Sequence, residues 1–133
     1  MITREADYAM RLAVYLAWAQ GRGRGTASCA EVSEAMDVPY RFLRKIVKRM
    51  VGTGLILSAR GKGGGLRLAR APRGISLLDI VKAMGPAGVT LSRCVAEPGD
   101  CPRSARCRVH TALLSIQGTV DKRLGALTLD KLV

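Results

Sequence analysis

The order of hydrophobic and polar positions divides the chain into helical and strand-like segments separated by glycine-rich turns. In residues 3–20, nearly every position from Ala6 to Trp18 is apolar. This pattern predicts a helix buried over most of its circumference, with Thr3 as its N-cap. Residues 21–26, GRGRGT, cannot continue this helix and predict a flexible, basic loop. The first predicted elements are therefore a core helix and a positively charged connection.

Two short helices are expected next. Ser28, with Glu31 three residues later, has the form of a capping box and predicts a helix through Met36. After a tight turn, Pro39 suits the first turn of a second helix that runs to about Val51. Two short helices joined by a tight turn are typical of a helix-turn-helix, although an ordinary helical hairpin has the same pattern.

The segment after these helices favours the helix-turn-helix. Strand-like runs at 55–60 and 66–70 are separated by residues 61–65, GKGGG. Because glycine tolerates positive φ, this loop can close a β-hairpin with Lys62 near its tip. A hairpin directly after a helix-turn-helix is the winged arrangement.

The rest of the chain predicts a short helix, a loop and a long helix. Ser76 and Asp79 form a second capping signature, which opens a helix to about Met84. Residues 85–106 contain several Gly and Pro residues and read as a loop. From about Cys107 to Leu124 apolar residues recur at helical spacing: Leu113, Leu114, Ile116, Val120 and Leu124. We expect this terminal helix to be buried against a second copy of the chain, because no further core remains to cover it.

These elements predict a mainly α fold with a small β-hairpin wing, a winged helix-turn-helix followed by a long C-terminal dimerisation helix. The expected divisions are a DNA-binding domain at 1–84, a cysteine-bearing loop at 85–106, and a dimerisation helix with a C-terminal tail at 107–133.

Charge points to a polyanionic partner. The chain has 22 Lys and Arg against 10 Asp and Glu, a formal net charge of +12. Aromatic residues make up only 4%, too few for base-stacking platforms, so double-stranded DNA is favoured over single strands. No apolar stretch approaches the ~20 residues of a membrane span, and no secretory signal is present, so we expect a cytoplasmic protein without a membrane partner.

The basic residues are concentrated where a winged helix binds DNA. Ten Lys and Arg and no acidic residue lie between Pro39 and Arg73, a bias that an ordinary mixed-charge surface does not explain. Arg44 could pair with a guanine or a phosphate, and Arg49 is expected near the backbone. Phe42 is expected in the core, and a core position is also the alternative for Tyr40. The residues expected at the DNA are Tyr40, Arg41, Arg44, Lys45, Lys48, Arg60, Lys62, Gly63 and Gly64.

Three cysteines and the single histidine form a second candidate site. Cys94, Cys101, Cys107 and His110 fall within 17 residues. Thiolate and imidazole ligands suit an iron–sulfur cluster or structural zinc, and a thiol/disulfide redox switch is a further alternative. Cys29 lies apart from them in a predicted helix and is expected to act as a small buried hydrophobe.

The combination of wing and cysteines resembles the Rrf2 family of bacterial iron–sulfur regulators, which includes IscR, NsrR and RirA. The resemblance lies in the segment 60–70, RGKGGGLRLAR, the segment 75–80, ISLLDI, and the three spaced cysteines. It extends from the residues 7–9, DYA, to the residues 127–129, LTL. It implies a homodimer with crossed C-terminal helices and an iron–sulfur cluster, either 2Fe–2S or 4Fe–4S.

The resemblance implies three cluster ligands, Cys94, Cys101 and Cys107, and two candidates for the fourth. His110, three residues after Cys107, is similar to the IscR pattern. Asp7 is similar to the NsrR pattern, in which an aspartate of the partner subunit is a ligand. Because residues three apart share a helix face, we favour His110, with Asp7 as the alternative.

The sequence thus predicts a homodimeric DNA-binding transcriptional regulator controlled by an iron–sulfur cluster that senses iron, nitric oxide or redox state. The alternative is a DNA-binding regulator with structural zinc or a thiol switch in place of the cluster. An enzyme is not expected, because no paired carboxylates, second histidine or phosphate-binding loop accompany the cysteines.

Overall fold

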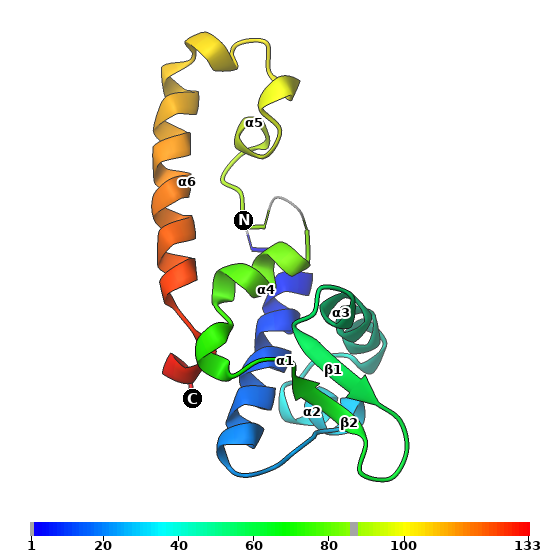
Figure 1. The fold of residues 1–133 in the computed structure, drawn as a ribbon. Coiled ribbons are helices and arrows are strands. Elements are labelled where there is room, and N and C mark those ends of the chain that lie inside the picture. Colours follow the sequence, from blue (N-terminus) through cyan, green and yellow to red (C-terminus); the bar gives the residue numbers. More distant parts are fainter. Residues whose placement is uncertain (1, 86–87) are drawn as a thin grey trace.

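The computed structural model describes residues 2–85 and 88–133 and shows a helical body from which one long helix extends (Figure 1). The body contains α1 (Arg4–Gly21), α2 (Cys29–Ala35), α3 (Tyr40–Gly52), β1 (Ile56–Ala59), β2 (Gly65–Leu68), the 3-10 turn η1 (Pro72–Gly74) and α4 (Leu77–Ala83). The remainder contains α5 (Arg93–Ala96), the 3-10 turns η2 (Pro98–Asp100) and η3 (Ser104–Arg106), α6 (Arg108–Ala126) and η4 (Leu129–Lys131). The predicted fold class, mainly α with a β-hairpin wing, is confirmed.

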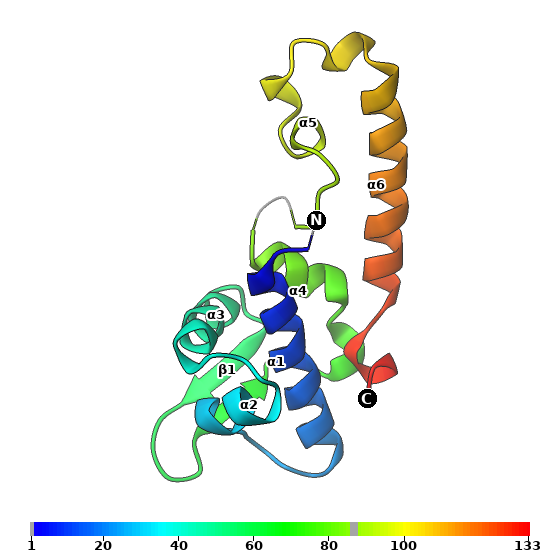
Figure 2. The same ribbon diagram turned by 180° about the vertical axis from the view of Figure 1, so that it is seen from behind.

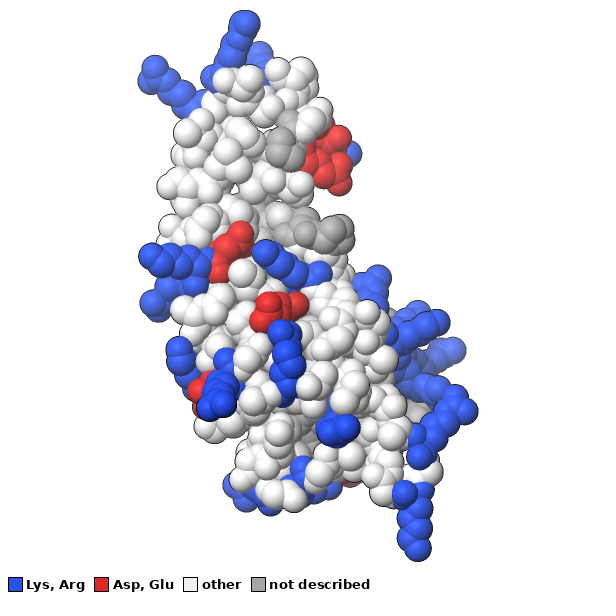
Figure 3. Space-filling view, in the orientation of Figure 1, with Lys and Arg blue, Asp and Glu red and all other residues white. Residues whose placement is uncertain are grey.

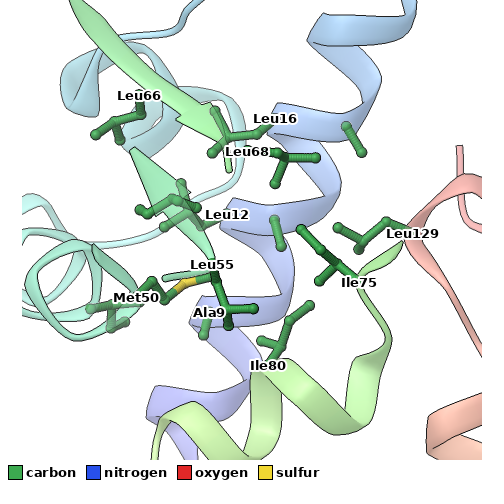
Figure 4. Packing of buried hydrophobic residues seen from close by; sticks show 14 of the residues in the cluster. Ala9, Leu12, Leu16, Met50, Leu55, Leu66, Leu68, Ile75, Ile80 and Leu129 are labelled. Carbon is green, nitrogen blue, oxygen red and sulfur yellow. The ribbon is translucent and has the colours of Figure 1, made fainter. Parts of the chain in front are cut away.

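Helix α1 is the centre of the body. Thr3 is its N-cap, as predicted, and its hydroxyl oxygen accepts a hydrogen bond from the Ala6 N–H at 3.1 Å. Leu12 and Leu16 lie in the core, and the alanines beside them let α3, α4 and the hairpin pack closely around the helix (Figure 4). The apolar run of the sequence is therefore the hub of a single hydrophobic cluster.

The helix-turn-helix forms with the predicted cap and turn. The Ser28 hydroxyl accepts a hydrogen bond from the Glu31 N–H at 3.1 Å. Between the two helices Asp37 has φ of 51°, a left-handed conformation that Asp tolerates better than most residues. Pro39 is the N-cap of α3 rather than part of its first turn, a shift of one position. The buried residues of α3, which are Leu43, Ile46 and Met50, recur at helical spacing and face α1.

The hairpin β1–β2 is antiparallel, with Ile56 opposite Leu68 and Ala59 opposite Gly65. An isolated bridge pairs Ala27 with Leu66, so the connection after α1 adds a third short strand segment beside β2. The Leu66 N–H donates to the Ala27 carbonyl at 2.7 Å. The wing is thus attached to the body along one edge.

The C-terminal residues return to the body after α6. The predicted capping box of α4 is present, with Ser76 and Asp79 bonded reciprocally. The Leu77 N–H donates to the Leu127 carbonyl at 2.9 Å, and the Leu129 N–H donates to the Ile75 carbonyl at 3.0 Å. Because Leu129 is fully buried beside Ile75 (Figure 4), the C-terminal end of α6 is fixed to the body.

Residues 88–107, here called the arm, run beside α6 (Figures 1 and 2). The sequence predicts only a loop at 85–106, of which residues 86–87 lie outside the described residues. The structure adds α5, η2 and η3, each a single short turn. Short turns of this kind carry no periodic pattern, so hydrophobic spacing does not reveal them.

The apolar side chains of α6 are only partly covered within the chain. Val120 and Leu124 pack against the body, Leu113 is half-buried, and Leu114 and Ile116 are exposed. The outer part of the helix therefore keeps an apolar surface. No helix among residues 2–85 and 88–133 is long and apolar enough to cross a membrane.

Candidate functional site

The basic residues of α3 lie on the side opposite its core residues. Arg41, Arg44, Lys45 and Lys48 are spaced as i, i+3, i+4 and i+7, and all four are exposed. Helical residues with this spacing share one face. The fold therefore turns a run of alternating basic and apolar residues into one positively charged surface.

An open groove of about 650 Å³ runs between this face and strand β1. Four cationic side chains line it, and no acidic residue is among its lining: Arg44, Lys45, Lys48 and Arg60. Tyr40 lies in the same groove and is 46% exposed, so it is not part of the core. The predicted residues of α3 and of the wing base are thus brought together.

The glycines of the wing fix its tip. Gly61 and Gly63 have φ of 89° and 80°, on either side of the exposed Lys62. A Cβ at Gly64 would lie 2.4 Å from the Ala59 carbonyl oxygen. The tight return of the loop therefore requires glycine, and it leaves Lys62 at the tip.

Figure 3 shows where charge gathers. Lys and Arg side chains lie along the right-hand edge, over α3 and the wing, and no acidic side chain interrupts them there. A second group of basic side chains lies at the far end of the molecule, at the N-terminal end of α6. The first group suits the phosphates of a DNA duplex.

One residue of α3, Phe42, differs from the sequence-based expectation, and a second, Arg49, has partners within the chain. Phe42 is 45% exposed rather than part of the core, because it precedes the buried stripe by one residue and packs on Tyr8 instead, with ring centroids 6.4 Å apart. Arg49, expected near the DNA backbone, donates to Glu5 at 2.8 Å and to the Met84 carbonyl at 2.9 Å.

The loop after α1 supports the wing. The Thr26 hydroxyl donates to the Gly64 carbonyl at 2.9 Å. Glu31 accepts hydrogen bonds from Arg24 and from Tyr15, and these two bonds hold the pKa of Glu31 below its ordinary value. The sequence predicts a flexible basic loop here. The contacts of Arg24 and Thr26 fix it instead.

Cys29 lines the basic groove, half-buried beside α3. Burial raises the pKa of its thiol, an effect that the nearby Arg44 opposes. The thiol is therefore kept in its neutral form more firmly than a free cysteine. The residue is half-buried at the edge of the groove rather than buried as expected.

The second candidate site lies where the arm meets the first turn of α6. Cys94 comes from α5, and its Sγ lies 3.4 Å from the His110 Nδ1 and 3.1 Å from the Ser92 Oγ. Cys107 is the N-cap of α6, and its Sγ accepts from the His110 N–H at 3.4 Å. Cys94 thus faces the imidazole of His110, which is only 8% exposed, whereas Cys107 contacts the backbone N–H of the same residue.

The pair Cys94 and His110 fits the donor chemistry of two metal ligands. For a tetrahedral ion with Zn–S near 2.3 Å and Zn–N near 2.0 Å, the two ligand atoms would lie about 3.5 Å apart. The separation between Cys94 Sγ and His110 Nδ1 is close to that value. The sulfur of Cys107 also faces the N-terminal end of a helix, where an electron-rich ligand is favoured.

Cys101 and Asp7 are not part of this group. Among the described residues no three His, Cys, Asp or Glu side chains converge closely enough to hold a metal ion. Cys101 is half-buried between η2 and η3, and its carbonyl accepts from the Ser104 hydroxyl at 2.9 Å. Asp7 lies on α1 and forms an ion pair with Arg11 at 2.8 Å.

Two residues that organise these sites were not predicted from the sequence. Thr26 supports the wing, and Gln117 of α6 binds the backbone of the arm. Thr26 lies in a segment that reads as a plain loop. Gln117 is a polar residue of an amphipathic helix, so the sequence pattern places it on the solvent side. Only the structure shows that it is buried.

Comparison with known proteins gives a consistent result. The family model Rrf2, described as an iron-dependent transcriptional regulator, matches residues 2–133. The protein aau3 of Rhizobium meliloti (strain 1021) is 30% identical over 132 residues, which cover 99% of this chain and 84% of that protein. A protein of Rhodobacter capsulatus described as an rrf2-like HTH-type transcriptional regulator is 30% identical over 138 residues, covering 100% of this chain and 92% of that protein.

Solved structures share the fold. IscR of T. potens superposes with a TM-score of 0.77 at 21% identity, covering 99% of this chain and 85% of that one. CymR (YrzC), the global cysteine regulator of B. subtilis, superposes with a TM-score of 0.74 at 22% identity, covering 99% and 95%. At these identities the likeness concerns the winged-helix architecture alone.

Proposed function

The chain belongs to the Rrf2 family of transcriptional regulators, and we propose that it is a homodimer whose affinity for its operator is controlled by an iron–sulfur cluster. Regulators of this family bind DNA and are typically dimers, and they are not enzymes. The observation that carries the proposal is the contact between Cys94 and the imidazole of His110 at the first turn of α6, the turn that Cys107 caps.

In this proposal Cys94, Cys101, Cys107 and His110 hold the cluster. His110 is preferred to Asp7 as the fourth ligand because its Nδ1 faces Cys94, whereas Asp7 is paired with Arg11. A bound cluster of the 2Fe–2S or 4Fe–4S type would supply reversible chemistry toward iron supply, nitric oxide or oxidants.

DNA binding falls to α3 and the wing. Tyr40, Arg41 and Arg44 occupy the N-terminal turns of α3, which enter the major groove in helix-turn-helix proteins. Lys45 and Lys48 are available to phosphates on the same face, and Arg60, Lys62, Gly63 and Gly64 let the wing approach the backbone or the minor groove.

The fold provides a physical route between the two sites. The arm contacts α6 at its N-terminal end, and α6 is fixed at its C-terminal end to α4 and to the residues before it. A change in how the arm is held against α6 would bias the position of that helix. In a dimer joined through α6, it would also bias the spacing of the two α3 helices on the DNA.

The test is anaerobic purification followed by the visible spectrum and by iron and sulfide analysis. We expect a brown protein, with iron and sulfide lost when Cys94, Cys101 and Cys107 are replaced together by Ser. The matched control is Cys29→Ser, which removes a cysteine outside the site and should keep the iron. A colourless protein holding zinc would favour the structural-zinc alternative, and a metal-free protein that responds to thiol oxidants would favour the thiol switch.

A further inference from the structure

Gln117 is a buried polar residue that binds the backbone of the arm. It is 7% exposed, and with His110 it is one of the two buried residues of α6 among those described. Its Oε1 accepts from the Leu91 N–H at 2.9 Å, and its Nε2 donates to the Val89 carbonyl at 2.5 Å. The two ends of one side-chain amide thus bind two nearby backbone groups of the arm, as in a strand pair.

The amide of Gln117 is also held in one orientation. Its Nε2 donates a second hydrogen bond to Asp121 Oδ1, one turn further along α6, at 2.9 Å. Both N–H groups and the carbonyl oxygen are therefore used. A side chain without these groups would leave the Val89 carbonyl and the Leu91 N–H without this partner, which is costly in a partly buried place.

The contact lies at the base of the arm, where the chain leaves the body. Val89 is 7% exposed and belongs to the hydrophobic core. Before it, Gly88 has φ of 58°, and a Cβ there would meet Lys82 Cγ at 3.3 Å. The base is therefore anchored to α4 on one side and to Gln117 on the other, and Cys94 follows Leu91 by only three residues.

His110 and Gln117 lie seven residues apart, two turns along one face of α6. Gln117 holds the arm at Leu91, and His110 contacts Cys94. We infer that Gln117 is a positioning residue for the cysteine site. It keeps the base of the arm against α6, so that Cys94 stays within reach of His110 before any metal binds.

This inference deepens the proposed function and rests on it for the identity of the metal group. The physical reason is preorganisation. If the base of the arm is loose, binding a metal must also order residues 91–94, and the entropy of that ordering weakens binding. Residues that orient metal ligands in this way change metal affinity by about 10-fold to 100-fold. We therefore expect on the order of a 10-fold loss for a variant without the amide.

The test uses the full chain and the variant Gln117→Met, which keeps the length of the side chain but makes none of its hydrogen bonds. Two measurements are made: hydrogen exchange of the Leu91 amide in the metal-free protein, and binding of Co²⁺ followed by its visible absorption. We expect faster exchange and about 10-fold weaker Co²⁺ binding in the variant. Thermal unfolding is measured in parallel, to show that the body remains folded.

Asp121→Asn is the matched control. It changes only the partner within α6 and leaves both contacts of Gln117 to the arm, so it should behave nearly as wild type. The inference is wrong if, in Gln117→Met, the Leu91 amide exchanges at the wild-type rate and Co²⁺ binds with the wild-type affinity.

Two further outcomes separate this inference from the proposed function. If the variant does not fold, the metal-free wild type still decides: the Leu91 amide must exchange much more slowly than unbonded arm amides, and equal rates would overturn the inference. If the wild-type protein shows a protected Leu91 amide but binds neither Co²⁺ nor iron, the contact between Gln117 and the arm is real. The metal site and the positioning role of Gln117 would then both be wrong.

Discussion

His110 and Gln117 occupy the same face of α6, two turns apart, and both contact the arm: His110 through the sulfur of Cys94 and Gln117 through the backbone of Val89 and Leu91. The two buried residues of this long helix are therefore polar, while Val120 and Leu124 pack on the body nearer its C-terminal end. Leu114 and Ile116 point elsewhere and are exposed. One face of α6 serves the cysteine site, and another is available to a second copy of the chain.

The first prediction concerns the fourth ligand. His110→Ala should lose the cluster or change its spectrum, because the imidazole faces Cys94. Asp7→Ala should leave the spectrum unchanged, because Asp7 is engaged with Arg11 on α1. Iron content and anaerobic spectra of both variants are the measurement. The opposite pattern, an unchanged His110→Ala and a cluster lost in Asp7→Ala, would place an aspartate of the partner subunit in the site.

A second prediction separates base reading from phosphate contact. Arg44→Ala should cost about 1–3 kcal/mol on a specific duplex and less on random DNA, if the guanidinium reads a base in the groove. Lys62→Ala should weaken binding to all sequences equally and lower the salt slope by about 1. Fluorescence anisotropy across a salt series measures both. Binding that does not weaken as salt is added would contradict the phosphate contacts.

The wing supplies a third prediction. Gly64→Ala places a Cβ 2.4 Å from the Ala59 carbonyl oxygen, so the loop must open. We expect lower DNA affinity and a loss of stability of about 1–3 kcal/mol. Gly118→Ala is the control, because a Cβ there meets nothing within 4 Å in the middle of α6. That substitution should stabilise the protein by about 0.5–1 kcal/mol. Equal behaviour of the two variants in chemical denaturation would show that the wing does not need Gly64.

The fourth prediction concerns the dimer. Val109 and Ile116 are 65% and 51% exposed on α6, and an interface related by two-fold symmetry would bury each of them twice. Ile116→Glu should therefore place two charges in the interface and shift the protein toward monomer in sedimentation experiments. Ser115→Glu, at the exposed neighbouring position, should remain dimeric. A wild-type protein that sediments as a monomer at micromolar concentration would contradict the proposed dimer.

Local signals predicted the body well. Helix caps and glycine turns depend on residues within a few positions of each other, which can be read from the sequence. This holds for the caps at Thr3, Ser28 and Ser76 and for the glycine turn of the wing. The side of α3 that faces the core followed from helical spacing alone, except that Phe42 lies just outside the buried stripe. A large aromatic residue at the border of a stripe is placed by its neighbours, here Tyr8, and not by periodicity.

The arm could not be predicted in the same way. Its turns are too short for a periodic pattern, and it is held by contacts between residues far apart in the chain, such as Leu91 with Gln117. Cysteine and histidine spacing predicted a shared site. The structure brings Cys94 to the imidazole of His110 and Cys107 to its backbone N–H, and no three ligand side chains converge among the described residues. The ion pair of Arg49 with Glu5 could not be predicted either, because Glu5 lies far away in the sequence, on another helix.

In the proposed regulator the metal site is coupled to the DNA site, so the cluster changes the affinity for DNA. A duplex that the protein binds is first selected from a random pool. The direct measurement is the dissociation constant of this duplex for the anaerobic protein, before and after its cluster is removed. We predict a difference of about 10-fold or more, equivalent to a coupling of about 1.4 kcal/mol, with the triple Cys-to-Ser variant at the cluster-free value under both treatments. Equal dissociation constants for the two forms of the wild-type protein would contradict the account.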